Sequence, residues 1–220
     1  MNAMVPLLEI DHLVVEIQSM PALRGFSMHV PRGAMVSLVG RNGAGKTTLM
    51  RSIMGLLAPA GGGVEFDGNN LVAMPTHSRT SLGIGYMPED RRLIPQLSVE
   101  ENLLLPAWAI GSADPAARLA SIYRLIPELR AFAASKALQL SGGQQKLVAL
   151  GRAMMAGTRL LLLDEPFEGV APALAQRLAE VIATLKGEGL SVMLSESDFQ
   201  HSARLVDRVF AIDRGVLSAA

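Results

Sequence analysis

The stretch GRNGAGKTT, Gly40 to Thr48, decides the fold. It follows the apolar run Ala34–Val39 and opens a segment whose apolar residues recur at helical spacing, which is the strand-to-helix context of a phosphate-binding loop. Its glycines let backbone amides point into one concavity, and the helix N-terminus adds positive charge there. We therefore predict that a polyphosphate binds here, because a glycine-rich turn with a chance Gly-Lys-Thr rarely occurs in this context. The predicted contacts are Gly40, Arg41, Asn42, Gly43, Ala44, Gly45, Lys46, Thr47 and Thr48.

Three side chains of this loop have distinct expected roles. Lys46 is expected to lie against the β- and γ-phosphates of a nucleotide. The Thr47 hydroxyl is expected to ligate Mg²⁺, and Thr48 to support the phosphates nearby. ATP and Mg²⁺ are therefore the expected ligands.

A second motif, RLLLLDEP, spans Arg159 to Pro166. Its apolar strand delivers Asp164 and Glu165 at its carboxyl end, the edge at which α/β sheets bind ligands. We expect Asp164 to hold Mg²⁺ and Glu165 to polarise the water that attacks the γ-phosphate. Alone, such an acid pair is more often a solvated strand end. Together with the phosphate loop it predicts a hydrolytic site.

Short apolar runs alternate with helical patterns along the chain, which indicates a wound, mainly parallel sheet. The strand pattern disappears between Pro88 and Gly157, where Ser98 and Glu101 have capping-box spacing and DPAARLASIYRLIPEL reads as one amphipathic helix. This region is predicted to be a helical insert. The glycine cluster PAGGGVEFDG is interpreted as a tight loop that opens a hairpin. The predicted strands are Leu13–Ile17, Ala34–Val39, Ile84–Met87, Leu160–Leu163, Ser191–Leu194 and Arg208–Ile212.

Composition excludes several classes of protein. Lysine plus arginine and aspartate plus glutamate both number 20, so neither nucleic acid nor an anionic membrane is expected as the main partner. Cysteine is absent, which excludes disulfides and thiolate metal sites. No run approaches the roughly 18 apolar residues of a membrane span, and the stretch MNAMVPLLEID lacks the pattern of a signal peptide. A cytosolic protein is expected.

The third motif, LSGGQQK, spans Leu140 to Lys146 and precedes a helix. Ser141 and the amides that follow it form a second anion site at a helix N-terminus, although one chain has little use for two such sites on one nucleotide. Here the sequence resembles the nucleotide-binding subunits of ABC transporters, whose signature motif is LSGGQ. The resemblance covers essentially the whole chain, with the three motifs in the family's order. It implies nucleotide contacts from Ser141, Gly142, Gly143 and Gln144.

In that family two ATP molecules are sandwiched between head-to-tail subunits. The resemblance implies an α/β P-loop NTPase fold with a RecA-like core, an N-terminal antiparallel β portion and an inserted helical subdomain. Residues 1–220 would form one ATPase domain, with residues 1–87 and 158–220 as the nucleotide-binding core and 88–157 as the insert. The implied location is cytoplasmic, peripheral to the inner face of the cell membrane.

Within the family, the chain is most similar to ATPase subunits of branched-chain amino-acid importers. The matching stretches are GYMPEDRRLIPQLSVEENLLLP and LLLDEPFEGVAPAL, although urea, amide and some aromatic-acid importers are similar there. Pro88–Arg92 would link the nucleotide site to the insert, and Glu168–Pro172 would meet the opposite subunit. The implied partners are a second ATPase subunit, like or unlike, and transmembrane permease subunits that bind around Leu93–Trp108. A solute-binding protein would act indirectly, and no nucleic acid is involved.

Three positions depart from the family pattern. No aromatic residue stands near Ile17 to Ser19, where many members stack the adenine. Glu89 replaces a glutamine that contacts Mg²⁺ and water, and it is either a metal ligand or a solvated loop acid. Ser197 stands where the family places a catalytic histidine or glutamine. His201, one helical turn later, either faces the same side or lies on the surface.

Two alternatives to an active importer ATPase follow. One is a hydrolysis-impaired nucleotide-binding module of a heteromeric importer, favoured by Ser197. The other is a soluble ABC ATPase that acts on DNA or ribosomes, disfavoured because the chain has no coiled-coil arms, zinc motif, second cassette or basic stripe.

Overall fold

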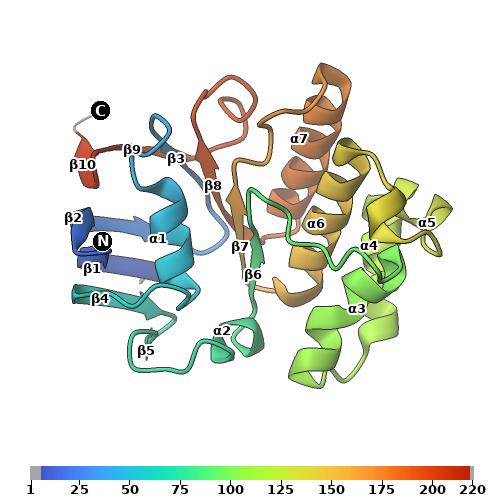
Figure 1. Ribbon diagram of the computed structural model, residues 1–220, viewed down its shortest axis with the longest axis horizontal. Helices are drawn as coiled ribbons and strands as arrows, with labels where there is room; N and C mark the ends of the chain where they lie inside the picture. Colours follow the sequence, from blue (N-terminus) through green and yellow to red (C-terminus); the bar gives the residue numbers. More distant parts are fainter. Residues whose placement is uncertain (1–5, 219–220) are drawn as a thin grey trace.

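Two β-sheets form the frame of the protein in the computed structural model, which describes residues 6–218 (Figure 1). The first sheet is antiparallel, has the strand order β2-β1-β4-β5, and lies at the left of Figure 1. Its strands are β1 (Leu8–Ile17), β2 (Met20–Val30), β4 (Gly61–Phe66) and β5 (Asn69–Asn70).

The second sheet crosses the middle of the molecule and has the order β10-β9-β3-β8-β7-β6. All neighbours pair in parallel except β10, which forms an antiparallel hairpin with β9. This mixture of a parallel core and an antiparallel portion confirms the predicted fold class. The strands are β3 (Met35–Val39), β6 (Ile84–Met87), β7 (Leu160–Asp164), β8 (Ser191–Glu196), β9 (Arg208–Asp213) and β10 (Val216–Ser218).

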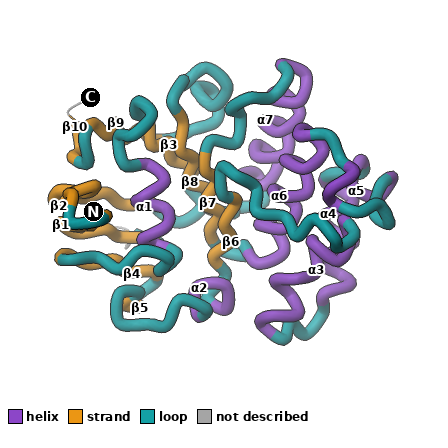
Figure 2. Tube along the Cα trace, in the orientation of Figure 1, coloured by secondary structure: helices purple, strands orange, loops and turns teal. Residues whose placement is uncertain are grey.

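The helices lie mainly on the side of the central sheet that faces away from the antiparallel sheet (Figure 2). Helix α1 lies between the two sheets, where its apolar side chains join their common core. None of the helices among residues 6–218 combines the length and the apolarity needed to cross a bilayer. The helices are α1 (Lys46–Ile53), α2 (Ser78–Ser81), α3 (Val99–Ile110), α4 (Pro115–Leu125), α5 (Glu128–Ala131), α6 (Gly142–Ala156) and α7 (Pro172–Gly187), with a 3₁₀ turn, η1 (Ala137–Gln139).

The central strands are buried on both faces because each face packs on a separate core. Along β7, Leu161 and Leu163 belong to the core shared with α6 and α7, whereas Leu160 and Leu162 belong to the core shared with α1 and the antiparallel sheet. Side chains of a strand point alternately to opposite faces, so a run of four leucines satisfies both cores. The sheet is therefore held rigidly between two apolar layers.

Two expectations about local structure were wrong. The glycine cluster is not a loop, because its three glycines begin β4, where Gly61 and Gly63 pair with β1. The hairpin expected after it is present, since β4 pairs antiparallel with β5. A Cβ on Gly62 would lie 2.3 Å from the carbonyl oxygen of His12, so a residue without a side chain is needed for this close approach. The expected helix over DPAARLASIYRLIPEL is two helices, α4 and α5, because Pro127 disfavours a helical conformation at Ile126.

The other expectations for residues 88–157 correspond to observed elements. Ser98 caps α3 through the predicted capping box with Glu101. Helices α3 to α6 all fall within this range, and its one isolated β-bridge joins Ser98 to Lys136. The expected absence of a signal peptide concerns a stretch whose first residues, 1–5, lie outside the described residues.

A buried carboxyl group ends β8. The Glu196 Oε2 atom accepts hydrogen bonds from the hydroxyls of Ser37, at 2.9 Å, and Ser202. The Oε1 atom is buried without a partner among the described residues. Burial raises the pKa of Glu196, with the two hydroxyls acting against that shift. The ionised form of this residue is therefore disfavoured in the folded protein.

We expect Glu196→Gln to stabilise the protein more at about pH 8 than at about pH 4. The unfolded chain ionises near the ordinary pKa of glutamate, but the folded chain resists ionisation, so the wild type loses stability as pH rises above that value. Glutamine keeps the shape and the acceptor but carries no charge. Urea unfolding of both proteins at both pH values measures the difference, and an equal difference at the two values would contradict this account.

Candidate nucleotide-binding site

The phosphate loop joins the end of β3 to the start of α1 and leaves no room for side chains at key positions. Gly45 begins the helix with φ of 114°, a conformation that L side chains rarely adopt. A Cβ on Gly40 would lie 2.4 Å from the carbonyl oxygen of Ile212 on β9. The strands on either side therefore enforce the glycines that the sequence pattern contains.

Lys46 is the buried cation of this loop, and only 5% of its surface is exposed. Its Nζ atom lies 3.0 Å from Glu165 Oε1 and donates to the Arg41 carbonyl, at 3.1 Å, and to Ser197 Oγ, at 3.1 Å. It also donates to the carbonyl of Gly40. All these acceptors are oxygens that phosphate oxygens can replace, so the ammonium group is placed to receive a polyphosphate.

Glu165 is held in an unusual backbone conformation, with φ of 48°. Its N–H donates to Ser195, both to the carbonyl, at 3.2 Å, and to the hydroxyl, at 3.1 Å. Its carboxylate accepts from the N–H of Ser197, at 3.1 Å, and from the Ser197 hydroxyl, at 2.7 Å. The neighbouring residues thus fix a strained main chain, and this fixes the direction of the carboxylate.

Asp164, one residue earlier, is completely buried. Its carboxylate accepts from Thr47 Oγ1 at 3.2 Å, from Ser195 Oγ at 2.5 Å and from the Tyr86 hydroxyl at 3.3 Å. Burial raises the pKa of Asp164, and the three hydroxyl donors act in the opposite direction. Burial and the adjacent Asp164 charge raise the pKa of Tyr86, which keeps that hydroxyl a donor.

Glu89 lies on the loop after β6 and lines the same clefts as Thr47, Asp164 and Glu165. It is exposed, yet partial burial and the nearby carboxylates, Glu168 first among them, raise the pKa of Glu89. Within residues 6–218, no group of three or more histidine, cysteine, aspartate or glutamate side chains could hold a metal ion. A cation at this site therefore needs oxygen ligands from a bound phosphate or from water as well.

The signature motif lies at the start of α6. Ser141 caps this helix: its Oγ accepts from the Gln144 N–H at 3.3 Å, and its N–H donates to Gln144 Oε1 at 2.9 Å. Gly142 and Gly143 line a cleft of about 520 Å³ together with Glu89 and Lys146. The phosphate loop lines a different cleft, of about 610 Å³. The structure therefore does not bring the two predicted anion sites together within one chain.

Lys146 was not predicted to have a role, yet it connects the signature helix to the acidic strand. It is 5% exposed, and burial lowers the pKa of its ammonium group. Its Nζ donates to the carbonyl of Glu165 at 3.0 Å and to that of Glu168 at 2.5 Å. Any movement of α6 therefore acts directly on the backbone of Glu165.

The segment after β8 differs from the expectation of a helix. It consists of turns, so the helical spacing expected between Ser197 and His201 does not exist. His201 is exposed, and its ring lies against Phe167 with 5.3 Å between ring centroids. Ser197 is the residue that contacts Lys46 and Glu165, and its Oγ also lies 2.8 Å from Asn42 Oδ1. The surface alternative for His201 therefore holds.

The sequence indicated Lys46, Thr47, Asp164, Glu165 and Ser197, and the structure brings all five together. It did not indicate Ser195 or Tyr86, the two further hydroxyls on Asp164. The signal for these residues appears only when strand order is known, because Ser195 pairs with Asp164 in the register of β7 and β8.

Comparisons with known proteins identify the family of the chain. The family model described as ABC transporter matches residues 23–168. The branched-chain amino acid transport ATP-binding protein BraG of Pseudomonas aeruginosa is 34% identical over 209 residues, which are 95% of this chain and 90% of BraG. The lipopolysaccharide export system ATP-binding protein LptB of Haemophilus influenzae is 30% identical, over 97% of this chain and 89% of LptB.

Solved structures give the same result. A structure described as the ATP binding subunit of an ABC transporter has a TM-score of 0.86 and 31% identity, covering 97% of this chain and 88% of the other. A nucleotide-free ATP-binding cassette from an ABC transporter has a TM-score of 0.84 and 26% identity, with 98% and 90% of the two chains covered.

We expect Lys46→Met to lower the affinity for ATP by at least about tenfold, because methionine keeps the length of the side chain but removes the charge that faces the phosphates. Titration calorimetry in the presence of Mg²⁺ measures the change. Lys136→Met, an exposed lysine on the insert, is the matched control. Unchanged affinity in a folded Lys46 variant would contradict the placement of the phosphates.

Proposed function

This chain belongs to the ABC transporter family, and we propose that it is the ATP-hydrolysing subunit of an importer for branched-chain amino acids or a chemically related small solute. As a family member it is an ATP-binding ATPase subunit of a transporter. One observation carries the rest: Lys46, Thr47, Asp164 and Glu165 converge on the edge where β3 and β7 end. A strand-end site that combines one cation with two acids suits phosphoryl transfer to water.

The chemistry is divided among these side chains. Lys46 and the loop amides would bind the β- and γ-phosphates and disperse the charge that builds up on them. When the phosphates bind, the Lys46 ammonium would pair with them instead of with Glu165. The Glu165 carboxylate would then be free. That carboxylate would then accept a proton from the attacking water, as a general base. Ser197 would orient Glu165 through its two hydrogen bonds.

Mg²⁺ fits the donor set of this site. Thr47 and Asp164 supply two oxygens 3.2 Å apart, and Mg²⁺ usually takes one or two protein ligands together with phosphate oxygens and water. The Glu89 carboxylate would accept a hydrogen bond from a water molecule bound to the ion. The ion would neutralise part of the triphosphate charge.

A second subunit is needed to bring the signature motif to a nucleotide. The motif residues do not line the phosphate-loop cleft of their own chain: Ser141, Gly142, Gly143 and Gln144. We infer that they bind the γ-phosphate held by a head-to-tail partner, through the helix N-terminus and the Ser141 hydroxyl. Each chain would then contribute its phosphate loop to one ATP and its signature motif to the other. The partner is either a like or an unlike ATPase subunit.

The proposed division of the chain follows the same logic. Residues 1–87 and 158–220 would form the nucleotide-binding core, and residues 88–157 the helical insert that carries the signature motif. Lys146 would connect the two, since it lies in α6 and binds the main chain after β7.

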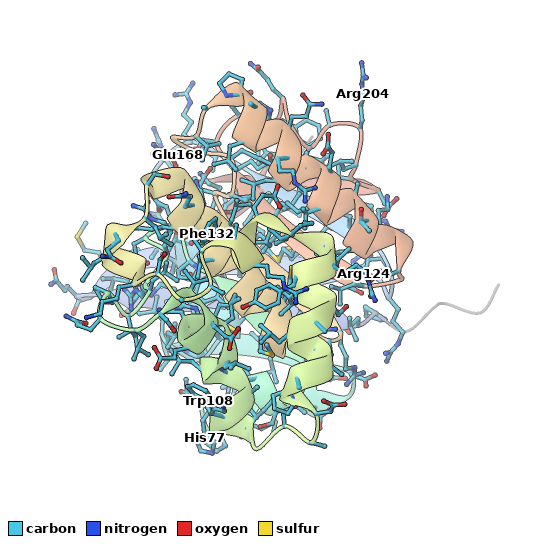
Figure 3. The ribbon with its side chains drawn as sticks, turned by 90° about the vertical axis from the view of Figure 1, so that its right-hand side faces the viewer. His77, Trp108, Arg124, Phe132, Glu168 and Arg204 are labelled. Atoms are coloured by element: carbon cyan, nitrogen blue, oxygen red, sulfur yellow. The ribbon has the colours of Figure 1, made fainter. Side chains whose placement is uncertain are left out.

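A groove beside the insert is suited to a transmembrane permease. It measures about 550 Å³ and is lined by Arg51, Leu56, Glu89, Pro106 and Arg152, among others. Trp108, 54% exposed, lies in the same helix as Pro106 and stands at the lower edge of the helical side (Figure 3). This groove adjoins Asp164 and Thr47, so an occupant would sense the nucleotide site. The chain would thus lie on the cytoplasmic face of the membrane, and a solute-binding protein would act only through the permease.

The solute class rests on similarity to BraG and on the stretches around Glu89 and Glu168. LptB relatives serve an exporter by name, so the direction of transport is part of the proposal. Reconstitution with the candidate permease tests it: ATP hydrolysis that rises when a leucine-loaded binding protein is added supports the importer. Stimulation by a lipid-exporting permease instead would overturn it.

We expect Glu165→Gln to keep ATP binding but slow hydrolysis by at least about a hundredfold, because the amide keeps the shape of the carboxylate and loses its basicity. A dimer closed on ATP should then accumulate, which gel filtration detects. The matched control is Glu188→Gln, an exposed glutamate at the end of α7, which should leave turnover unchanged. Equal turnover in the wild type and the Glu165 variant would show that another group is the base.

We also expect ATP hydrolysis at this chain's own phosphate-loop site to be slow, because the Ser197 hydroxyl is bound to Glu165 and the side chain is shorter than the histidine or glutamine that the family places there. This observation favours the second candidate, a nucleotide-binding module whose hydrolysis is impaired. Replacing Ser197 with glutamine or histidine should raise single-turnover hydrolysis, by up to about 10²–10³-fold. His201→Ala should leave the rate unchanged. No increase in either Ser197 variant would place the defect elsewhere.

A further inference from the structure

Two arginines without charge partners line the phosphate-loop cleft at its edge. Arg24, on β2, and Arg214, in the turn between β9 and β10, lie there with Ile17, Pro21 and Ala22. Both arginines are exposed. Among residues 6–218, neither guanidinium group makes an ion pair or a hydrogen bond. Positive charge therefore stands unneutralised beside the loop.

The main chain fixes both arginines at this place. Gly215 donates its N–H to the carbonyl of Ala44, in the phosphate loop, at 2.9 Å, and its own carbonyl accepts from the Arg24 N–H at 2.9 Å. A Cβ on Gly215 would lie 2.3 Å from the carbonyl oxygen of Ala22, so the turn is tightly seated against β2. Arg214, directly before Gly215, is consequently held beside both Arg24 and the loop.

We propose that Arg214 stacks its guanidinium group on the purine base of the bound nucleotide, with Ile17 and Arg24 completing the base subsite. The inference rests on the proposed function, because it places the base of the same triphosphate. No aromatic residue stands at Ile17 to Ser19, and a guanidinium group is the other planar side chain that stacks well on an aromatic face. Arg214 would therefore take over the contact that an aromatic ring would otherwise supply.

This subsite has a consequence for selectivity. A stacked guanidinium group contacts the face of the base and does not read its edge, so adenine and guanine are bound alike. The five residues at this edge, Ile17, Pro21, Ala22, Arg24 and Arg214, include no side chain that accepts a hydrogen bond from the adenine amino group. We expect the affinities for ATP and GTP to agree within about threefold.

The test compares three ligands, ATP, GTP and inorganic tripolyphosphate, by titration calorimetry on the purified protein with Mg²⁺. Arg214→Lys keeps the positive charge but removes the planar guanidinium group that would stack on the base. It should weaken ATP and GTP by about three- to tenfold and leave tripolyphosphate unchanged. Arg204→Ala is the matched control, since that exposed arginine points away from the body of the protein (Figure 3). It should change none of the three affinities.

Two results would overturn the inference while leaving the proposed function intact. One is an Arg214→Lys variant that binds ATP as tightly as the wild type does. The other is a wild type that prefers ATP to GTP by more than about tenfold, which would require contacts to the edge of the base. A wild type that binds none of the three ligands would instead refute the proposed function, and the base subsite with it.

Discussion

The site depends on the parallel pairing of β3, β8 and β7. In this register Val39, the last residue of β3, is paired with Glu196, and Ser195 is paired with Asp164. Three chain segments distant in sequence therefore leave the sheet at one edge. The phosphate loop, the acid pair and Ser197 all begin there, so Lys46 lies within 3.1 Å of both Glu165 and Ser197. Without this pairing, none of these side chains would meet.

A feature of the fold or the site could be predicted from the sequence when it depends only on residues close together in the chain. The phosphate loop and the capping of α6 by Ser141 depend on neighbouring residues, so pattern alone located them. The contacts of Ser195 and Tyr86 with Asp164 depend on which strands are neighbours, and nothing in either residue's local sequence gives that order. The role of Lys146 could not be predicted for the same reason. Its local sequence is that of an ordinary helical lysine, and it is buried against the backbone of Glu165 only in the folded chain. The strand at Gly61 was mistaken for a loop because a close approach to β1, rather than propensity, puts glycine there.

Electrostatic balance explains why so many charges are tolerated in the interior. Lys46 and Glu165 are both almost completely buried and neutralise each other, and hydroxyl donors surround Asp164. Lys146, buried nearby, faces main-chain carbonyls instead of a carboxylate. The Asp164 carboxylate therefore has no cationic partner within the part of the chain that the structure describes, and the cleft can accept an added cation. A triphosphate bound to a metal ion carries both signs of charge. Lys46 faces its negative charge, and Asp164 faces its positive charge.

The alternation of β7 between two cores has a consequence for how such a chain can diverge. Deleting one residue from Leu160–Leu163 would send every later side chain of the strand to the opposite face, and both apolar layers would have to be rebuilt together. Substitutions are constrained more loosely, since either layer tolerates another apolar residue of similar volume. Over evolutionary time, lineages of this protein should therefore exchange apolar residues freely within the central strands. Changes in length should accumulate instead in the surface connections, such as those on either side of α4.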